Sequence, residues 1–336
     1  CMVEMVDSRN HLRMRRILLS IVLLTCFAWQ AVADDPIRDA FPLRNYNPFL
    51  QVFGLPKFQT AELVRPDRFE FALSYDIAND ADDAARPEGD LVIDGEMQAI
   101  AFSLRRRVLE RMEIGIDVPY VRHSGGSLDS LVKDWHNLVG LSNSMREGPN
   151  DQIHHSFALD GTTYYELSTA ESGIGDVQLS AAYALQHVTF RAGIKLPTGD
   201  PGKLTGSGAA DFSLGLYAGS TTTLFERAFD YSGFFGALLL GDGEVMPEFQ
   251  RSSVAYGGLA LRWHATDRLA LSMQWSVQSS YFDIDIDEIG GSTIQFAIGG
   301  DYRFKHSLLR LAIVEDVAAG AAPDFALHLS IRSFGG

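Results

Sequence analysis

The stretch RFEFALSYDI, at residues 68–77, decides the fold class of this chain. Its apolar side chains occupy every second position, from Phe69 to Ile77, and alternate with small or polar ones such as Glu70 and Asp76. Alternate positions of a β-strand face opposite sides, so the pattern predicts a strand with one apolar and one polar face. About twelve such segments of roughly nine to eleven residues follow one another, and that length lets a tilted strand cross a bilayer.

The connections between these segments alternate in length. Short turns are expected near residues 106–111, 186–187, 221–228, 265–268 and 305–307. Longer loops are expected near 78–92, 122–175, 197–210, 241–252, 279–291 and 317–323. Bacterial outer-membrane barrels combine an even strand number with short periplasmic turns and long external loops. The sequence therefore predicts an all-β fold, a transmembrane antiparallel β-barrel of about twelve strands.

The polar faces carry many charges, which argues against the alternative of a soluble β-sandwich. Burying unpaired charges in a sandwich core costs several kcal/mol each, whereas a wet barrel lumen accepts them. The residues expected to line the lumen are Glu70, Asp76, Arg105, Glu113, Asp117, Arg191, Lys195, Arg262, Asp301, Arg303, Arg310 and Arg332. The sequence leaves open whether these charges pair as a structural ladder or screen a permeant.

The first residues have the features of a targeting segment. Arg13, Arg15 and Arg16 precede an apolar run at residues 17–27, and AVADD offers a cleavage site after Ala33. Both cysteines precede that site, so the mature protein is expected to form no disulfide. We therefore expect export to the bacterial outer membrane.

This interpretation divides the chain into a signal peptide at 1–33, a periplasmic or plug segment at 34–66 and a barrel at 67–336. The expected partners are outer-membrane lipid, lipopolysaccharide, the barrel assembly machinery and an unidentified small permeant. The formal net charge of −15 argues against nucleic acid. The segment at 34–66 is aromatic, and we expect it to fold into the lumen or across its periplasmic end. Its aromatic residues include Phe41, Tyr46, Phe49, Phe53 and Phe58.

One stretch, GGSLDSLVKDWHNLVGLSNSMREG at residues 125–148, departs from the strand pattern. Its apolar residues recur at the spacing of an amphipathic helix. They are Leu128, Leu131, Val132, Trp135, Leu138 and Val139. The predicted helix lies in the longest extracellular loop, where it would form a lid or constriction or would simply pack on the barrel rim.

Three stretches resemble a known family. They are RNYNPFLQVFGLP at residues 44–56, HSGGSLDSLVKDWHNLVGLSN at 123–143 and GIKLPTGD at 193–200. They are similar to segments of the predicted outer-membrane proteins grouped as domain of unknown function 3187. The stretch KLPTGD…GSGAADFSLGL is also similar to outer-membrane proteins associated with phenol-degradation gene clusters and presumed to pass aromatic compounds. The resemblance implies a fold and a location.

The C-terminus departs from the usual pattern of this class, because Phe334 is followed by two glycines instead of ending the chain. Phe334 also shares its strand face with Arg332, Ser330 and His328 and not with the apolar set. Either a bulge rephases the end of the strand, or the terminal signal is imperfect.

Signals for chemistry are weak. His154 and Ser156 would face one side of a strand, which keeps open a lipid hydrolase as an alternative. The acidic run DIDIDE at 283–288 lacks the spacing of a calcium loop. We predict no catalytic residue, metal or cofactor. The favoured function is a passive conduit for small hydrophobic or aromatic compounds, and a sealed structural barrel is the other alternative.

Overall fold

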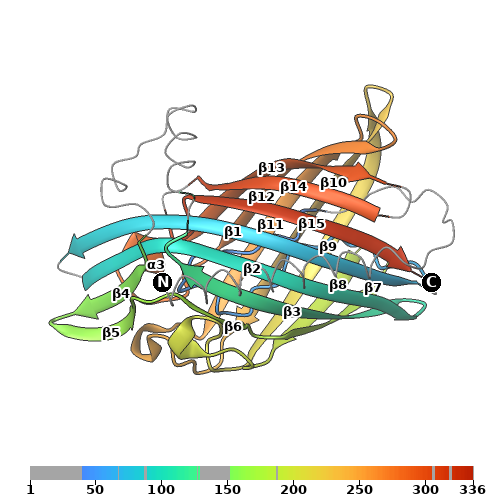
Figure 1. The fold of residues 1–336 in the computed structure, drawn as a ribbon. Helices are drawn as coiled ribbons and strands as arrows, with labels where there is room; N and C mark the ends of the chain where they lie inside the picture. Colours follow the sequence, from blue (N-terminus) through green and yellow to red (C-terminus); the bar gives the residue numbers. More distant parts are fainter. Residues whose placement is uncertain are drawn as a thin grey trace, which may run out of the picture.

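The computed structural model describes residues 40–66, 68–86, 89–126, 128, 152–186, 188–304, 307–317 and 320–335. Within them one antiparallel sheet closes on itself, because β1 pairs with both β2 and β15 and β2 pairs with β3. Of its fifteen strands, twelve form the barrel wall (Figure 1). The twelve are β1 (Phe69–Arg86), β2 (Gly89–Leu109), β3 (Met112–Ser124), β7 (Gln178–Ala184), β8 (Val188–Lys195), β9 (Asp211–Leu224), β10 (Arg227–Leu239), β11 (Ser253–Trp263), β12 (Leu269–Gln278), β13 (Thr293–Arg303), β14 (Ser307–Asp316) and β15 (Phe325–Gly335). The predicted twelve-stranded barrel is confirmed.

Three shorter strands extend the wall at one end: β4 (His154–Leu159), β5 (Thr162–Leu167) and β6 (Glu171–Ile174) (Figure 1). β4 pairs with the outer part of β2, β5 pairs with β4, and β6 pairs with β3. The expectation of a loop throughout 122–175 is therefore wrong for β4, β5 and β6. The expectation of a loop at 78–92 is also wrong, because β1 and β2 extend through most of that range. The β1–β2 hairpin is longer than the barrel wall, and the free edge of its outer half is completed by β4.

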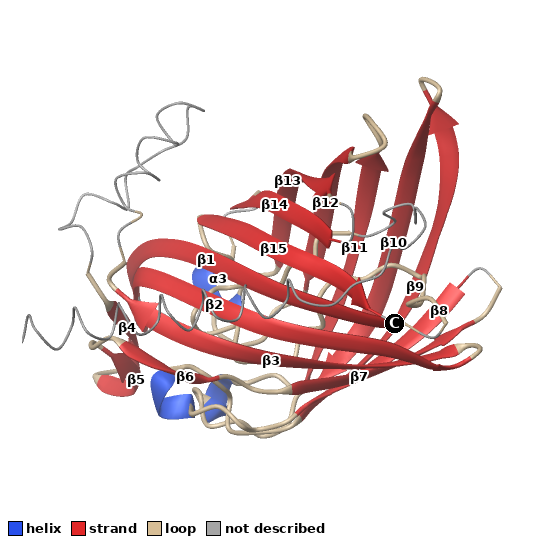
Figure 2. Ribbon diagram, turned by 45° about the vertical axis from the view of Figure 1, so that its right-hand side comes forward, coloured by secondary structure: helices blue, strands red, loops and turns tan. Residues whose placement is uncertain are grey.

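Among the described residues, helix occurs as three short turns in the long loops: η2 (Pro201–Lys203), η3 (Pro247–Phe249) and α3 (Asp287–Gly290) (Figure 2). In the described part of the chain, no helix combines the length and hydropathy needed to span a membrane. Of the predicted lid helix only Leu128 is described, and it lies in a loop. The remaining residues of that helix lie outside the described residues, so the helix stays a prediction: Leu131, Val132, Trp135, Leu138 and Val139.

The alternation in the sequence becomes the two faces of the wall. Along β12 the outward side chains of Leu271, Met273 and Val277 are 44–46% exposed, whereas the inward Ser272 and Gln274 are buried. An apolar outer surface on a closed barrel is the lipid-facing surface of an outer-membrane protein. The fold is therefore that of an outer-membrane β-barrel.

The last strand keeps its register to the end. Phe334 pairs with Glu70 and Phe325 pairs with Asn79, with no shift between them. No bulge rephases this strand in the described residues, so Phe334 stays on the face of Arg332, whose guanidinium lies 5.2 Å from the Phe334 ring.

The two ends of the barrel differ. The short connections after β2, β7, β9, β11 and β13 lie at one end, here called the turn end. The longer connections after β3, β8, β10, β12 and β14 lie at the other, here called the loop end. In this class of barrel the loop end faces outward from the cell and the turn end faces the periplasm.

Candidate functional site in the barrel lumen

Residues 40–66 run inside the barrel and are called the inner segment below. The segment starts beside β14, where Arg310 Nη1 donates to the carbonyl of Ala40 (2.7 Å). It turns at residues 47–53 among the long loops of the loop end. It then returns along the inward faces of β3 and β8 to the turn end. The inner segment therefore traverses the lumen from one end to the other and back.

At the loop end one buried lysine holds the returning part of the segment. Lys195 Nζ lies 2.8 Å from Asp176 Oδ2 and 3.1 Å from Asp211 Oδ2, and it donates to the Val52 carbonyl (3.0 Å). Asp211 also accepts from the Gly54 N–H (2.8 Å). A Cβ atom at Gly54 would lie 2.9 Å from the Asp211 Cβ, so this close approach requires glycine. These contacts tie the inner segment to β8 and β9.

In the middle of the lumen the segment contributes a charge of its own. Lys57 Nζ lies 3.2 Å from Asp117 Oδ1, and both side chains are less than 10% exposed. Asp117 Oδ2 also lies 3.3 Å from Arg105, which lies 3.6 Å from Glu70. Glu70 in turn pairs with Arg332 (3.3 Å). Lys57 is thus the end of a charge ladder that crosses β3, β2, β1 and β15.

Near the turn end a second ion pair clamps the descending backbone. Arg191 Nη1 lies 2.9 Å from Glu113 Oε1, and Arg191 Nη2 donates to the carbonyls of Thr60 (3.0 Å) and Glu62 (2.9 Å). Glu113 Oε2 accepts from the Val64 N–H (2.6 Å). The pair therefore binds the backbone of the segment on both sides.

The opposite wall holds the start of the segment. Asp301 is fully buried between Arg262 and Arg310, with Arg310 Nε 2.6 Å from Asp301 Oδ1. Gln274 accepts from the Phe41 N–H (2.9 Å) and donates to the Phe41 carbonyl (3.2 Å). The side-chain amide of Gln274 thus makes both backbone hydrogen bonds that a neighbouring strand would otherwise make with Phe41.

Most of the lumen charges named from the sequence meet in these pairs, and Asp76 pairs with His328 (2.5 Å). Arg303 differs, because it lies at the turn end of β13 and is partly exposed. The sequence left open whether the lumen charges pair with one another as a structural ladder or screen a permeant. The structure has the charges pair with one another and also bind the backbone of the inner segment. Uncharged residues also hold the inner segment in place, among them Asn45 and Asn47, which the sequence analysis did not name.

The loop end is closed by an aromatic cluster around the turn of the inner segment. Phe53 stacks on Tyr281 (ring centroids 5.1 Å apart) and meets Phe282 edge-on (5.6 Å). Phe49 meets Tyr165 edge-on (5.6 Å). Phe49, Phe53 and Phe282 are fully buried. The tip of the inner segment is therefore the apolar centre of the loop end.

Two buried histidines adjoin this cluster. The rings of His123 and His155 lie 5.8 Å apart, and the ring of His155 also contacts Phe49 (6.5 Å). Neither ring nitrogen of His155 has a hydrogen-bond partner among the described residues. Burial lowers the pKa of His155 well below its usual range, so this side chain is neutral at pH 7.

The weaker chemical signals of the sequence fall elsewhere. His154 and Ser156 lie on β4, opposite Asp94 and Val92 of β2, in the extension of the wall. The acidic run at 283–288 lies in the loop before β13 and includes the start of α3. The described residues contain no group of three or more histidine, cysteine or acidic side chains placed to hold a metal ion.

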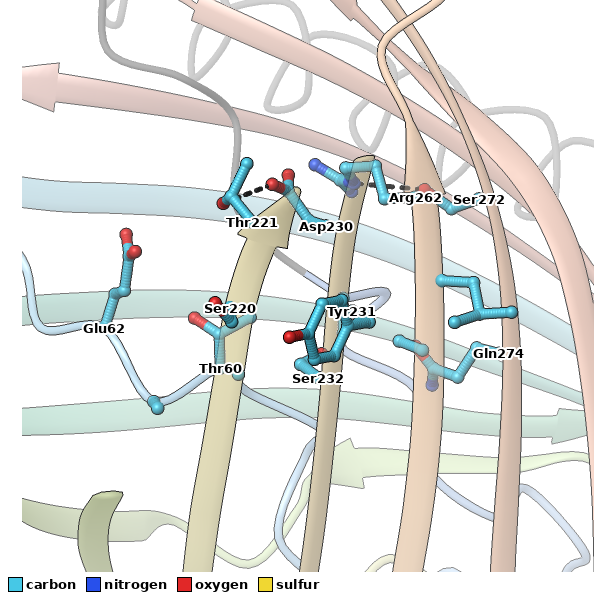
Figure 3. A pocket seen from close by; sticks show the side chains of 15 residues that line it. Thr60, Glu62, Ser220, Thr221, Asp230, Tyr231, Ser232, Arg262, Ser272 and Gln274 are labelled. Atoms are coloured by element: carbon cyan, nitrogen blue, oxygen red, sulfur yellow. Dashed lines mark hydrogen bonds between the residues drawn. The ribbon is translucent and has the colours of Figure 1, made fainter. Parts of the chain in front are cut away.

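A cavity of about 220 Å³ remains between the inner segment and the wall formed by β9 to β12 (Figure 3). Thr60 and Glu62 of the segment line one side of it. On the wall side Thr221 donates to Asp230 (2.7 Å), and Arg262 Nε donates to Ser272 (3.0 Å). The lumen is therefore not completely filled on this side.

The chain matches one protein family and is similar to several solved outer-membrane structures. Residues 15–334 match the model of a family described as "Protein of unknown function (DUF3187)", which confirms the resemblance noted in the sequence. No curated protein matches the chain. One similar solved structure is the COG4313 outer membrane channel from Pseudomonas putida F1, with 15% identity over 81% of this chain and 97% of that chain and a TM-score of 0.49. Others are the toluene transporters TodX of P. putida (12%, 80% and 89%, 0.36) and TbuX of Ralstonia pickettii (7%, 81% and 88%, 0.34). These identities are too low to carry a function across.

Proposed function

The chain belongs to the DUF3187 family, whose function is unknown, and from that starting point we propose that it is a passive conduit across the bacterial outer membrane. The conduit is closed by the inner segment. It admits small hydrophobic or aromatic compounds when that segment withdraws.

The observation that carries this proposal is that a separate segment, and not the wall, fills the lumen. Inward positions of the wall are often small, as at Ala99, Ala101, Ser213 and Gly215, and leave room for another occupant. Among the described residues, hydrogen bonds, ion pairs and apolar packing hold this occupant to the wall. Water can replace the partner in each of its polar contacts, which offsets part of the cost of withdrawal.

The position of the segment in the chain suits withdrawal. We propose cleavage after Ala33, which places the free N-terminus only a few residues before the segment. The segment can then leave through the turn end without breaking any strand pairing, because it remains joined to the wall only at β1.

The class of permeant is suggested by the aromatic cluster at the loop end. Withdrawal of Phe49 and Phe53 would expose the rings of Tyr165, Tyr281 and Phe282 at the mouth of the lumen. Such rings bind flat apolar molecules by stacking and edge-on contacts. A mouth lined by such rings favours aromatic compounds.

Single-channel conductance in planar bilayers tests the proposal. The full-length protein is expected to be mostly closed with brief openings, and a variant lacking residues 34–66 is expected to be persistently open. A monoaromatic compound should reduce the current through the open variant, whereas glycerol at the same concentration should not. Two folded barrels without conductance would contradict the proposal and favour the sealed structural barrel. Esterase activity lost in His154→Ala and Ser156→Ala would favour the hydrolase.

A further inference from the structure

Three side chains at the seam between the first and last strands form a chain of hydrogen bonds. His328 Nδ1 lies 2.5 Å from Asp76 Oδ1, and His328 Nε2 lies 2.9 Å from Ser330 Oγ. His328 and Ser330 are two residues apart on β15, so both face the lumen, and Asp76 is the register partner of His328 on β1. The residues are 2%, 1% and 7% exposed in the order Asp76, His328, Ser330.

The order of these contacts is that of a nucleophilic triad. With the Nδ1 proton donated to the carboxylate, Nε2 has its lone pair free to accept the Ser330 hydroxyl proton. The carboxylate fixes the tautomer and orientation of the ring, and the ring lies within the reach expected of a general base. Such a constellation is identified by geometry and roles, whatever the fold.

The surroundings of Ser330 contain donors without partners. Ser330 lies between Ser74 of β1 and Arg310 of β14 in the sheet register. Ser74 Oγ and Arg310 Nη2 are both buried and have no hydrogen-bond partner among the described residues. Leaving a buried donor unsatisfied destabilises the folded state, and more so when the donor is charged. These two donors lie on the strands that flank Ser330, one on each side.

The inner segment covers this site. Tyr46 is buried and belongs to the same apolar cluster as Ala78 of β1 and Ala326 of β15, which lie two residues from Asp76 and His328 on their strands. The triad therefore becomes accessible only when the segment moves, which links it to the opening of the lumen.

We propose that Ser330 is an activated nucleophile that attacks carboxylic esters entering the open lumen, with His328 as its general base and Asp76 as the positioning carboxylate. This inference rests on the proposed withdrawal of the inner segment. Ser330 Oγ attacks the ester carbonyl carbon and passes its proton to His328 Nε2. The bond from carbon to the alkoxy oxygen breaks, the leaving alkoxide takes that proton, and an acyl-Ser330 ester and an alcohol remain. Water then attacks the acyl group, His328 takes the proton of the water and returns it to Ser330 Oγ, and the carboxylic acid leaves.

A fluorophosphonate probe tests the proposal, because serine displaces its fluoride only when a base activates the hydroxyl. The probe is applied to the full-length protein, to full-length Lys57→Met, in which the hold on the inner segment is weaker, and to the variant lacking residues 34–66. Mass spectrometry is expected to find the adduct on Ser330 and to find more of it in the two variants. Ser330→Ala should abolish the adduct and His328→Gln should slow its formation at least 100-fold. Ser213→Ala is the matched control, because it removes a buried inward serine of β9 that lies outside the triad, and it should retain the adduct.

Two further readouts make every result decisive. Ser330→Cys in each background is treated with a water-soluble maleimide, which reports whether solvent reaches this position. Reaction of the cysteine without any fluorophosphonate adduct on the serine would overturn the nucleophile, and so would a cysteine that no reagent reaches. Conductance is recorded on the same preparations. An open channel without an adduct contradicts only the triad, and an adduct without conductance contradicts only the conduit.

Discussion

Replacing Lys57 by methionine should open the barrel, because Lys57 is the one side chain of the inner segment that forms an ion pair in the middle of the described lumen. The pair with Asp117 spans 3.2 Å, and both side chains are less than 10% exposed. Breaking a buried ion pair costs about 3–5 kcal/mol when the remaining charge has no other partner. Asp117 keeps Arg105 at 3.3 Å and a hydrogen bond from Ser103, so we expect a smaller loss of about 2 kcal/mol. Methionine retains the length and apolar stem of the lysine and so separates charge from packing.

A loss of about 2 kcal/mol corresponds to roughly a 30-fold rise in the ratio of open to closed states, at 1.36 kcal/mol per tenfold. The assay is open probability in planar bilayers, with unitary conductance unchanged because the wall is untouched. The control is Lys203→Met, which breaks an exposed pair with Glu171 and should have almost no effect. Adding Asp117→Asn to Lys57→Met removes the carboxylate that has lost its lysine partner and should recover part of the closed state. The reasoning is refuted if folded Lys57→Met shows the same open probability as the parent protein.

Three further variants or conditions test the other contacts of the inner segment. Arg191→Met leaves Glu113 without its cation and should weaken the closed state by about 3–5 kcal/mol, which limited proteolysis from the turn end would detect as faster cleavage near residue 62. Phe53→Ala removes a fully buried ring and should cost about 3–5 kcal/mol in the closed state, seen as increased open probability; no increase would contradict the aromatic closure. Because the pKa of His155 is lowered in the folded state, its contribution to stability is complete above the unfolded pKa of about 6.5 and is lost as the pH falls toward the folded pKa. The protection factors of amides at the tip of the inner segment, corrected for the intrinsic pH dependence of exchange, should therefore fall between pH 7 and pH 5, and His155→Phe should reduce that pH dependence.

The wall was predictable because its information is local. A strand whose two faces meet lipid and lumen repeats every two residues, so a stretch such as 68–77 specifies both its conformation and its orientation. The alternation of short and long connections adds the topology. The sequence did not predict the outer extension of the wall by β4 and β5. These strands come from a stretch that the sequence analysis assigned to a long loop, and they pair with the edge of the β1–β2 hairpin. Such edge pairing leaves no periodic signal of its own in the sequence.

The contacts inside the lumen were less predictable because they join distant residues and often end on backbone atoms. Asn45 donates to the carbonyl of Ala321 (2.6 Å), 276 residues away in the chain. A carbonyl acceptor has no signature in the sequence, so the role of Arg191 in binding two of them could not be inferred from its residue type. The His328-x-Ser330 spacing was visible on one strand face, but its carboxylate partner Asp76 lies 252 residues earlier.

The distribution of contacts along the inner segment bears on how a permeant could act. Along the lumen the segment is held by charges and amides whose partners water can replace, so water offsets part of the cost of releasing each contact. At the loop end it is held by Phe49 and Phe53, which are fully buried and which water cannot replace. An apolar compound that occupies the place of these rings against Tyr281 and Phe282 would restore the lost burial and bind the open state better than the closed one. A ligand shifts a conformational equilibrium only by such a difference in affinity. An aromatic permeant is therefore expected to open its own path, and open probability should rise with its concentration on the loop side before the permeant itself begins to reduce the current.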